Sequence, residues 1–185
     1  FSIAHLPSGI FMAVARSFDA GFATRYNLGR LANLLVYVFV CYFAIKKIKS
    51  GKMILVTISL FPTNLFMATN YAYDPWVIAF SMLGIAYYTS MLQQPKRIIR
   101  MWDIIIMTGA FAVASLPKLV YIVLMAIPLF MIKEWSGKRE RREYYTILTM
   151  VFAVVFAYFL MVSFTKIGGT GDVRGGDVNP KAQLD

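Results

Sequence analysis

Charged residues are scarce in this chain, making up 15% of its 185 residues, whereas soluble domains carry about a quarter. Histidine and cysteine are nearly absent, with one copy each at His5 and Cys41. A single cysteine excludes an intrachain disulfide and a zinc site built on thiolates, and a single histidine excludes a histidine-rich metal or triad site within this chain. A net charge of +10 would otherwise suggest nucleic acid as a partner. We expect none, because most of this chain cannot offer the solvated basic face that such binding requires.

Apolar residues are correspondingly abundant: 59% of the chain is hydrophobic and 16% aromatic, and the mean hydropathy is +0.63. This composition is typical of membrane proteins, so the lipid bilayer is the first expected partner. The apolar residues form continuous runs without the alternation of strands, at 31–45, 53–69, 76–92, 104–116, 119–132 and 144–164. Because backbone groups in lipid must be satisfied internally, such runs predict helices, and the fold class is an all-α polytopic transmembrane bundle.

The six runs differ in how well they match a bilayer, which a helix of about 20 residues crosses. The run 144–164 is long enough unaided. The runs 31–45, 53–69 and 76–92 reach that length once flanking residues that snorkel are included. The pair 104–116 and 119–132 is short for two full spans. It is either capped by interfacial residues or forms a hairpin whose tip lies within the membrane.

Basic residues are concentrated in alternate loops, which fixes a predicted orientation. Three such loops hold 12 of the 19 basic residues: Lys46, Lys47, Lys49, Lys52, Lys96, Arg97, Arg100, Lys133, Lys138, Arg139, Arg141 and Arg142. The positive-inside rule predicts that these loops face the cytoplasm from a multi-pass protein of the bacterial cytoplasmic membrane. The turn at 70–76, Lys118 and the C-terminal tail then lie on the outer side.

Three regions follow from this topology. Residues 1–27 form an outer juxtamembrane segment, in which 10–18 is expected to be an interfacial helix. Residues 28–164 form the transmembrane bundle, and 165–185 form an outer polar loop rich in glycine. Because the chain begins at Phe1 and stops soon after this polar loop starts, we expect it to be the interior of a longer protein.

The turn Asn70-Tyr71-Ala72-Tyr73-Asp74-Pro75-Trp76 holds an acid that has two interpretations. Asp74 is a suitable N-cap for the helix that follows, where Pro75 suits the first position and the helix dipole favours a negative charge. Alternatively, Asp74 faces an outward cavity, where it contacts a substrate hydroxyl or a divalent cation.

Lys118 follows Pro117 at the tip between two apolar runs. A lysine near hydrocarbon costs about 2.5–3.5 kcal/mol on insertion scales, so it is usually paired or functional. It either snorkels to the outer headgroups or binds a lipid phosphate. The tail is similarly ambiguous: a generic loop, or a site loop in which glycines allow close backbone approach and Asp172, Arg174 and Asp177 contribute charge.

The order of several short motifs resembles a known family. Gly-Arg-Leu-Ala-Asn at 29–33 opens a span, Tyr-Asp-Pro follows at 73–75, Ala-Ser-Leu-Pro-Lys at 114–118, and Gly-Asp-Val-Arg-Gly-Gly-Asp-Val-Asn-Pro at 171–180. Together these resemble a bacterial polytopic membrane family, a numbered domain of unknown function. That family is grouped with the GT-C glycosyltransferases and is often found with cell-surface polysaccharide genes.

The resemblance implies a GT-C-like enzyme that transfers a sugar from a polyprenyl-phosphate donor to a glycan or other envelope acceptor on the outer face. It implies that Lys118, Arg30 and Arg174 hold the donor phosphate, with Asp172 and Asp177 nearby, and that Asp74 takes part in catalysis. The family's principal acid belongs to a first outer loop, which we expect to precede this chain. In this chain Tyr73 precedes the acid of the turn and Pro75 follows it, a departure from the family's Ser-Pro-Asp.

Two other functions remain open. A transporter or flippase for lipid-linked saccharides would carry paired polar residues deep inside several spans, whereas the charges here cluster at the ends of the runs, with Asn64 and Lys118 as exceptions. A non-catalytic assembly subunit is favoured if Asp74, Lys118 and Arg174 lie far from one another.

Overall fold

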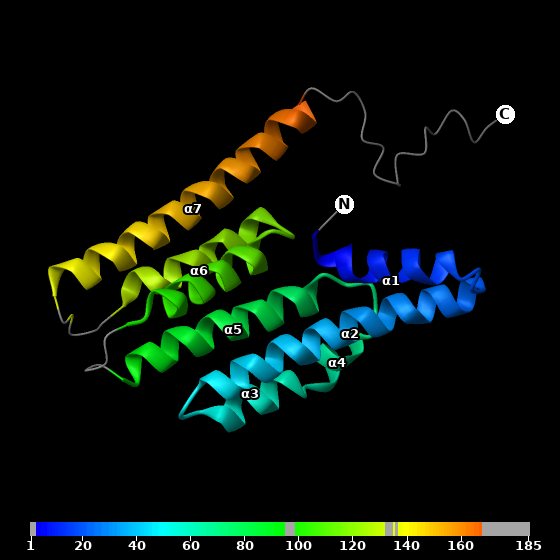
Figure 1. Cartoon of the computed structure of the whole chain (residues 1–185), viewed down its shortest axis with the longest axis horizontal. Helices are drawn as coiled ribbons and strands as arrows, with labels where there is room; N and C mark the ends of the chain where they lie inside the picture. Colours follow the sequence, from blue (N-terminus) through cyan, green and yellow to red (C-terminus); the bar gives the residue numbers. More distant parts are fainter. Residues whose placement is uncertain (1–2, 95–98, 132–134, 136, 168–185) are drawn as a thin grey trace, which may run out of the picture.

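The computed structural model describes residues 3–94, 99–131, 135 and 137–167, and these fold into helices (Figure 1). Within these described residues the helices are, in chain order, η1 (Ile3–His5), α1 (Leu6–Ser17), α2 (Phe22–Lys47), α3 (Lys52–Ser59), α4 (Pro62–Ala68), α5 (Asp74–Leu92), α6 (Met101–Ser115), η2 (Leu119–Phe130) and α7 (Lys138–Ile167). The described residues contain no strand, so the all-α prediction is confirmed.

Within the described residues, three helices are long and apolar enough to cross a membrane: α2, α5 and the segment Lys138–Val162 of α7. They contain the runs predicted at 31–45, 76–92 and 144–164. At 1.5 Å per residue, the 26 residues of α2 extend about 39 Å, more than the roughly 30 Å of a hydrocarbon core. The first turns of α2 therefore exceed what a span requires, and α1 packs beside them (Figure 1).

The run 53–69 forms two short helices, α3 and α4, rather than one. Pro62 has no backbone N–H, so the Ile58 carbonyl loses its usual partner four residues on. Asn64 replaces that donor, with its Nδ2 lying 2.8 Å from the Ile58 oxygen. The neighbouring carbonyl of Ser59 accepts a hydrogen bond of 2.9 Å from the hydroxyl of Tyr37 on α2. The break is thus stabilised within the protein, as lipid requires.

The short pair of runs forms two helices of different kinds. α6 has 15 residues of α-helix and η2 has 12 residues of 3-10 helix. An α-helix rises about 1.5 Å per residue and a 3-10 helix about 2.0 Å. The two helices are therefore similar in length, with α6 at about 22 Å and η2 at about 24 Å. Both are shorter than a hydrocarbon core, as expected for this pair.

The helices form a layer in which α2 packs on α5, α5 on α6 and α6 on α7, while α3 and α4 pack along α2 and α5 (Figure 1). Two apolar cores hold the layer together. One surrounds Tyr37 and Met82 between α2, α3, α4 and α5. The other surrounds Phe111 and Tyr144 between α5, α6, η2 and α7. The predicted helix at 10–18 exists as α1, whereas its interfacial location stays a prediction.

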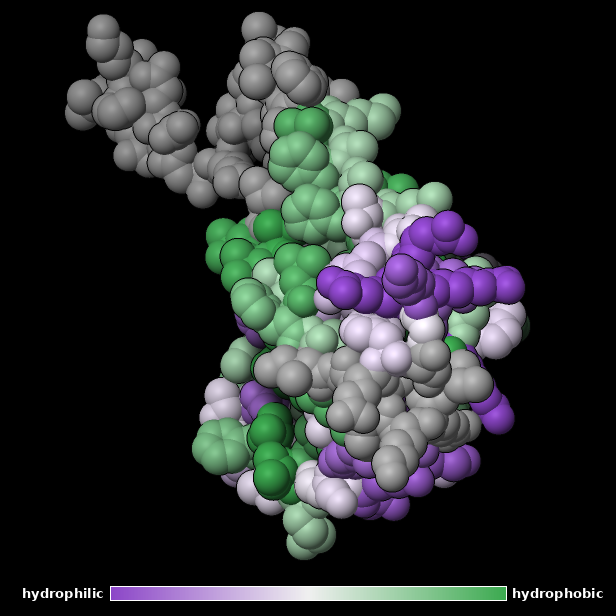
Figure 2. Space-filling model, turned by 90° about the vertical axis from the view of Figure 1, so that its left-hand side faces the viewer, coloured by the Kyte–Doolittle hydropathy of each residue, from purple (hydrophilic) through white to green (hydrophobic). Residues whose placement is uncertain are grey.

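The segments that carry the basic loops meet at one end of this layer. Lys47 forms an ion pair of 2.6 Å with Asp103, which joins α2 to the start of α6. The backbone N–H of Ile99 donates to a Glu140 oxygen at 2.8 Å, which joins the second loop to α7. Hydrophilic side chains gather on this face of the molecule (Figure 2). We call it the basic end; which side of the membrane it faces stays a prediction.

Candidate functional site

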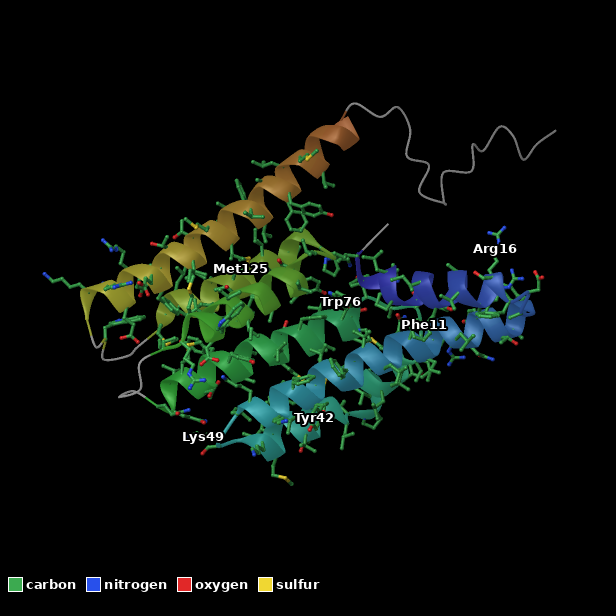
Figure 3. The ribbon with its side chains drawn as sticks, viewed as in Figure 1. Phe11, Arg16, Tyr42, Lys49, Trp76 and Met125 are labelled. Atoms are coloured by element: carbon green, nitrogen blue, oxygen red, sulfur yellow. The ribbon has the colours of Figure 1, made fainter. Side chains whose placement is uncertain are left out.

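The turn between α4 and α5 lies at the opposite end of the layer and is held by several other helices. Asn33 of α2 donates from its Nδ2 to the Asn70 carbonyl at 3.0 Å. Trp76 of α5 donates from its indole to the Val113 carbonyl of α6 at 3.1 Å. In Figure 3, Lys49 lies at the basic end and Trp76 lies at the other end of α5, with α1 and α2 extending beyond it. We call this end, with its turn at 69–76, the Asp74 end.

Tyr71 ties the same turn to α1 and α2. Its hydroxyl donates to the Tyr26 carbonyl at 2.8 Å and lies 3.5 Å from the sulfur of Met12. Gly29 makes this approach possible, because a Cβ on Gly29 would lie only 2.2 Å from the Tyr71 hydroxyl oxygen. The turn is therefore held in place by helices from both sides, which suits residues that must keep a fixed geometry.

Lys118 lies at the Asp74 end, between α6 and η2. Its ammonium lies 4.5 Å from the ring centroid of Tyr73, within the range of a cation–π contact. Hydrogen bonding to Tyr73 and the electrostatic influence of its hydroxyl raise the pKa of Lys118, and Asp74 adds a smaller effect in the same direction. The side chain is exposed. Lys118 is thus an exposed cation beside Tyr73 and near Asp74, whereas its outer-side location stays a prediction.

Asp74 is the first residue of α5, and the residue in the capping position is Tyr73, which forms no side-chain cap. The interpretation of Asp74 as the helix cap is therefore wrong. The prediction assumed that Pro75 is the first residue of the helix, whereas α5 begins one residue earlier, at Asp74. Its carboxylate accepts no hydrogen bond from the part of the chain that the structure describes. Asp74 therefore combines the dipole at the start of a helix with the nearby charge of Lys118.

Arg30 contacts the turn from α2, and its role in holding the donor phosphate stays a prediction. Its Nε donates to the Thr69 carbonyl just beyond α4, where a cation stabilises a helix C-terminus. Its guanidinium also lies 5.8 Å from the ring of Tyr26. Within the described residues no contact joins Arg30 to Lys118 or Asp74, so Arg30 fixes the turn from the α2 side.

The remaining predicted site residues, Asp172, Arg174 and Asp177, lie outside the described residues. Their convergence with Lys118 stays a prediction. Among the residues that are described, no group of three or more His, Cys, Asp and Glu side chains forms that could hold a metal ion.

An apolar groove of about 510 Å³ runs between α6 and α7. It is lined by small and branched side chains, with Tyr158 at one edge: Ile3, Ala112, Val113, Leu116, Met150, Val151, Val154, Val155 and Tyr158. A second groove, of about 400 Å³, shares Ile3 and Tyr158 with it and continues along α1. The first groove lies where α7 diverges from α6 toward the C-terminal end of α7 (Figure 1).

This groove joins the Asp74 end through α6. Val113 lines the groove and also accepts the hydrogen bond from Trp76, two residues after Asp74. Leu116 lines it two residues before Lys118. Sequence reasoning missed the groove, although the valines and alanines of α6 and α7 were its signal: small side chains leave space where two helices separate.

The comparisons with known proteins give one match. The model of the family described as "Predicted membrane protein (DUF2142)" matches residues 2–185. No curated protein and no solved structure matches the chain. The chemistry of the site is therefore inferred from its own residues.

Proposed function

The chain belongs to the DUF2142 family of predicted membrane proteins, and from this premise we propose that it is an integral membrane glycosyltransferase of GT-C-like fold. Its donor is a sugar linked to polyprenyl phosphate, and its acceptor is a glycan or another envelope molecule on the outer face. The observation that carries the proposal is the meeting of a cation, an acid and an apolar groove at the Asp74 end.

The donor has two parts that suit this arrangement. A polyprenyl chain is apolar and long, and the groove between α6 and α7 is lined by apolar side chains over about 510 Å³. A phosphate is anionic, and Lys118 offers an exposed ammonium two residues from Leu116 at the edge of that groove. A donor with its chain in the groove therefore brings its phosphate toward Lys118.

The transfer step requires positioning and charge stabilisation more than covalent chemistry. The bond between the sugar C1 and the phosphate oxygen breaks, and a bond between C1 and an acceptor hydroxyl oxygen forms. Lys118 stabilises the negative charge on the departing polyprenyl phosphate. The hydroxyl proton passes to a carboxylate, for which Asp74 is the candidate here, alongside the acid that the resemblance places in the first outer loop.

The proposal is tested by replacing Lys118. In the purified protein we expect Lys118→Ala to lower the rate of sugar transfer from a polyprenyl-phosphate donor by about a hundredfold, as for other groups that stabilise developing charge. Lys118→Arg should keep part of the activity because the cation remains. Lys49→Ala, an exposed lysine at the basic end, is the matched control and should change nothing.

In cells, Lys118→Ala should remove a surface glycan modification while protein abundance stays normal. An unchanged glycan profile at normal abundance would overturn the proposal. If the protein were instead a flippase, impairing it with Lys118→Ala would leave the lipid-linked saccharide on the inner leaflet. The flippase alternative gains little support from Asn64, because its amide already donates to the Ile58 carbonyl.

A further inference from the structure

One face of α7 is turned away from α6 and η2. Along it runs a shallow groove of about 510 Å³ whose lining comes from α7 alone: Arg142, Tyr145, Thr146, Thr149, Met150 and Ala153. These residues recur every three or four positions and so follow one stripe of the helix. The stripe begins with a cation, continues with hydroxyl-bearing side chains and ends with apolar ones.

The level of Arg142 relative to a bilayer follows from the residues beyond it. The uncharged run 144–164 extends about 31 Å at 1.5 Å per residue, which matches a hydrocarbon core of about 30 Å. Tyr145, which is half-buried, lies at the start of this run, where aromatic belts are usual. Arg142 therefore lies at the headgroup level of the leaflet at the basic end, and the rest of the stripe lies beside the acyl chains.

Among the described residues, Arg142 differs from the two arginines near it on α7, each of which has a partner. Arg139 forms an ion pair of 2.8 Å with Glu143. The guanidinium of Arg141 lies 5.9 Å from the ring of Tyr145. Within the part of the chain that the structure describes, Arg142 forms no hydrogen bond or ion pair, and its side chain is exposed.

We propose that this groove binds an anionic phospholipid of the leaflet at the basic end. Its phosphate pairs with the guanidinium of Arg142, a planar group suited to phosphate. One acyl chain lies along Thr149, Met150 and Ala153. Charge favours this occupant over a second apolar helix, because a helix would cover Arg142 without giving it a counter-ion. The groove shares Met150 with the groove between α6 and α7, but its cation, Arg142, belongs to the basic end, so the site does not depend on the proposed function.

The test measures lipid retention on the purified protein by native mass spectrometry, with phosphatidylglycerol and phosphatidylcholine as probes. We expect preferential retention of phosphatidylglycerol. Arg142→Gln should reduce its apparent affinity about fivefold, the effect of one basic residue near an anionic surface. Arg139→Gln removes the same charge from the same helix, but this arginine already forms an ion pair. Its apparent affinity for phosphatidylglycerol should stay within about twofold of that of the unsubstituted protein. Thr149→Trp, which fills the groove, should also weaken phosphatidylglycerol binding.

Several results would overturn the proposal. Equal losses in Arg142→Gln and Arg139→Gln would indicate diffuse attraction to the whole basic end. Unchanged retention in Arg142→Gln, or displacement of the lipid by inorganic phosphate at constant ionic strength, would remove the lipid site. Dimers that dissociate in Thr149→Trp would assign the face to a second copy of the chain.

Discussion

Asn64 shows how one side chain makes a break in an apolar run tolerable. The break follows from Pro62, which removes the donor that the Ile58 carbonyl would have four residues on. The Phe61 N–H donates to this carbonyl at 3.3 Å instead. The Asn64 amide adds a second, shorter bond of 2.8 Å.

Because the Phe61 N–H still donates to the Ile58 carbonyl, we expect Asn64→Leu to lower the free energy of unfolding by about 0.5–1.5 kcal/mol, the net contribution of one hydrogen bond. Thr57→Val is the control: Thr57 lies exposed on α3 and should change stability by less than about 0.5 kcal/mol. Denaturation in mixed detergent micelles measures both. Equal stabilities of the two variants would show that the Asn64 amide contributes no net stability at the break.

The charge of Lys118 is also set by one neighbour. Because hydrogen bonding to Tyr73 raises the pKa of Lys118, the ammonium is retained to higher pH than in a free lysine. The folded-state pKa is the raised one, so this stabilisation is fully present below the ordinary lysine pKa. It is lost as the pH rises through the folded value.

Tyr73→Phe keeps the ring but removes the hydroxyl, so the pKa of Lys118 should fall. The rate at which an amine reagent modifies Lys118, followed by mass spectrometry across alkaline pH, reports this change. Lys49 serves as the internal reference. A Lys118 profile that does not move in Tyr73→Phe would show that the hydroxyl does not stabilise the ammonium.

At the scale of the helices, the contact between α5 and α6 depends on a glycine. A Cβ on Gly84 would lie 2.9 Å from the ring of Phe111, which is fully buried. A Cβ on Gly109 of α6, by contrast, would have no other atom within 4 Å. In a helix, alanine is otherwise favoured over glycine by roughly 1 kcal/mol.

Gly84→Ala should therefore destabilise the protein by about 1–3 kcal/mol through overpacking, despite its better helix propensity. Gly109→Ala should be neutral or stabilising. Thermal unfolding of the two variants in one detergent gives the comparison. If Gly84→Ala were as stable as Gly109→Ala, the prediction of overpacking would be wrong, and the Phe111 ring would have room to move away from the added methyl group.

How much of the fold can be predicted from the sequence depends on the length of each element. Uncharged runs near 20 residues, such as 144–164, predict helices because lipid leaves few alternatives. The 3-10 conformation of η2 has no such signal, because it depends on what packs against it: the Tyr144 hydroxyl donates to the Pro128 carbonyl at 2.7 Å. The run 53–69 was predicted as a single helical segment, so neither its break at Pro62 nor the residues that satisfy the break were predicted.

At the scale of the whole molecule, topology predicted part of the candidate site. Asp74 and Lys118 were assigned to one side by the alternation of basic loops, and they do lie at one end. The link of Arg30 to Thr69 was not predicted, because it depends on how far α2 extends beyond α4. The groove between α6 and α7 was missed because it depends on the angle between two helices, which composition does not fix.

The orientation of this end decides whether transfer can occur on the outer face. The basic loops predict that Lys118 faces outward and Lys49 inward. In a background in which Cys41→Ala removes the one native thiol, Lys118→Cys should react with an impermeant maleimide in intact cells. Lys49→Cys should react only after permeabilisation. The opposite result would place Lys118, Asp74 and the mouth of the groove on the cytoplasmic side, where donors linked to nucleotides are available and an outer-face acceptor is not.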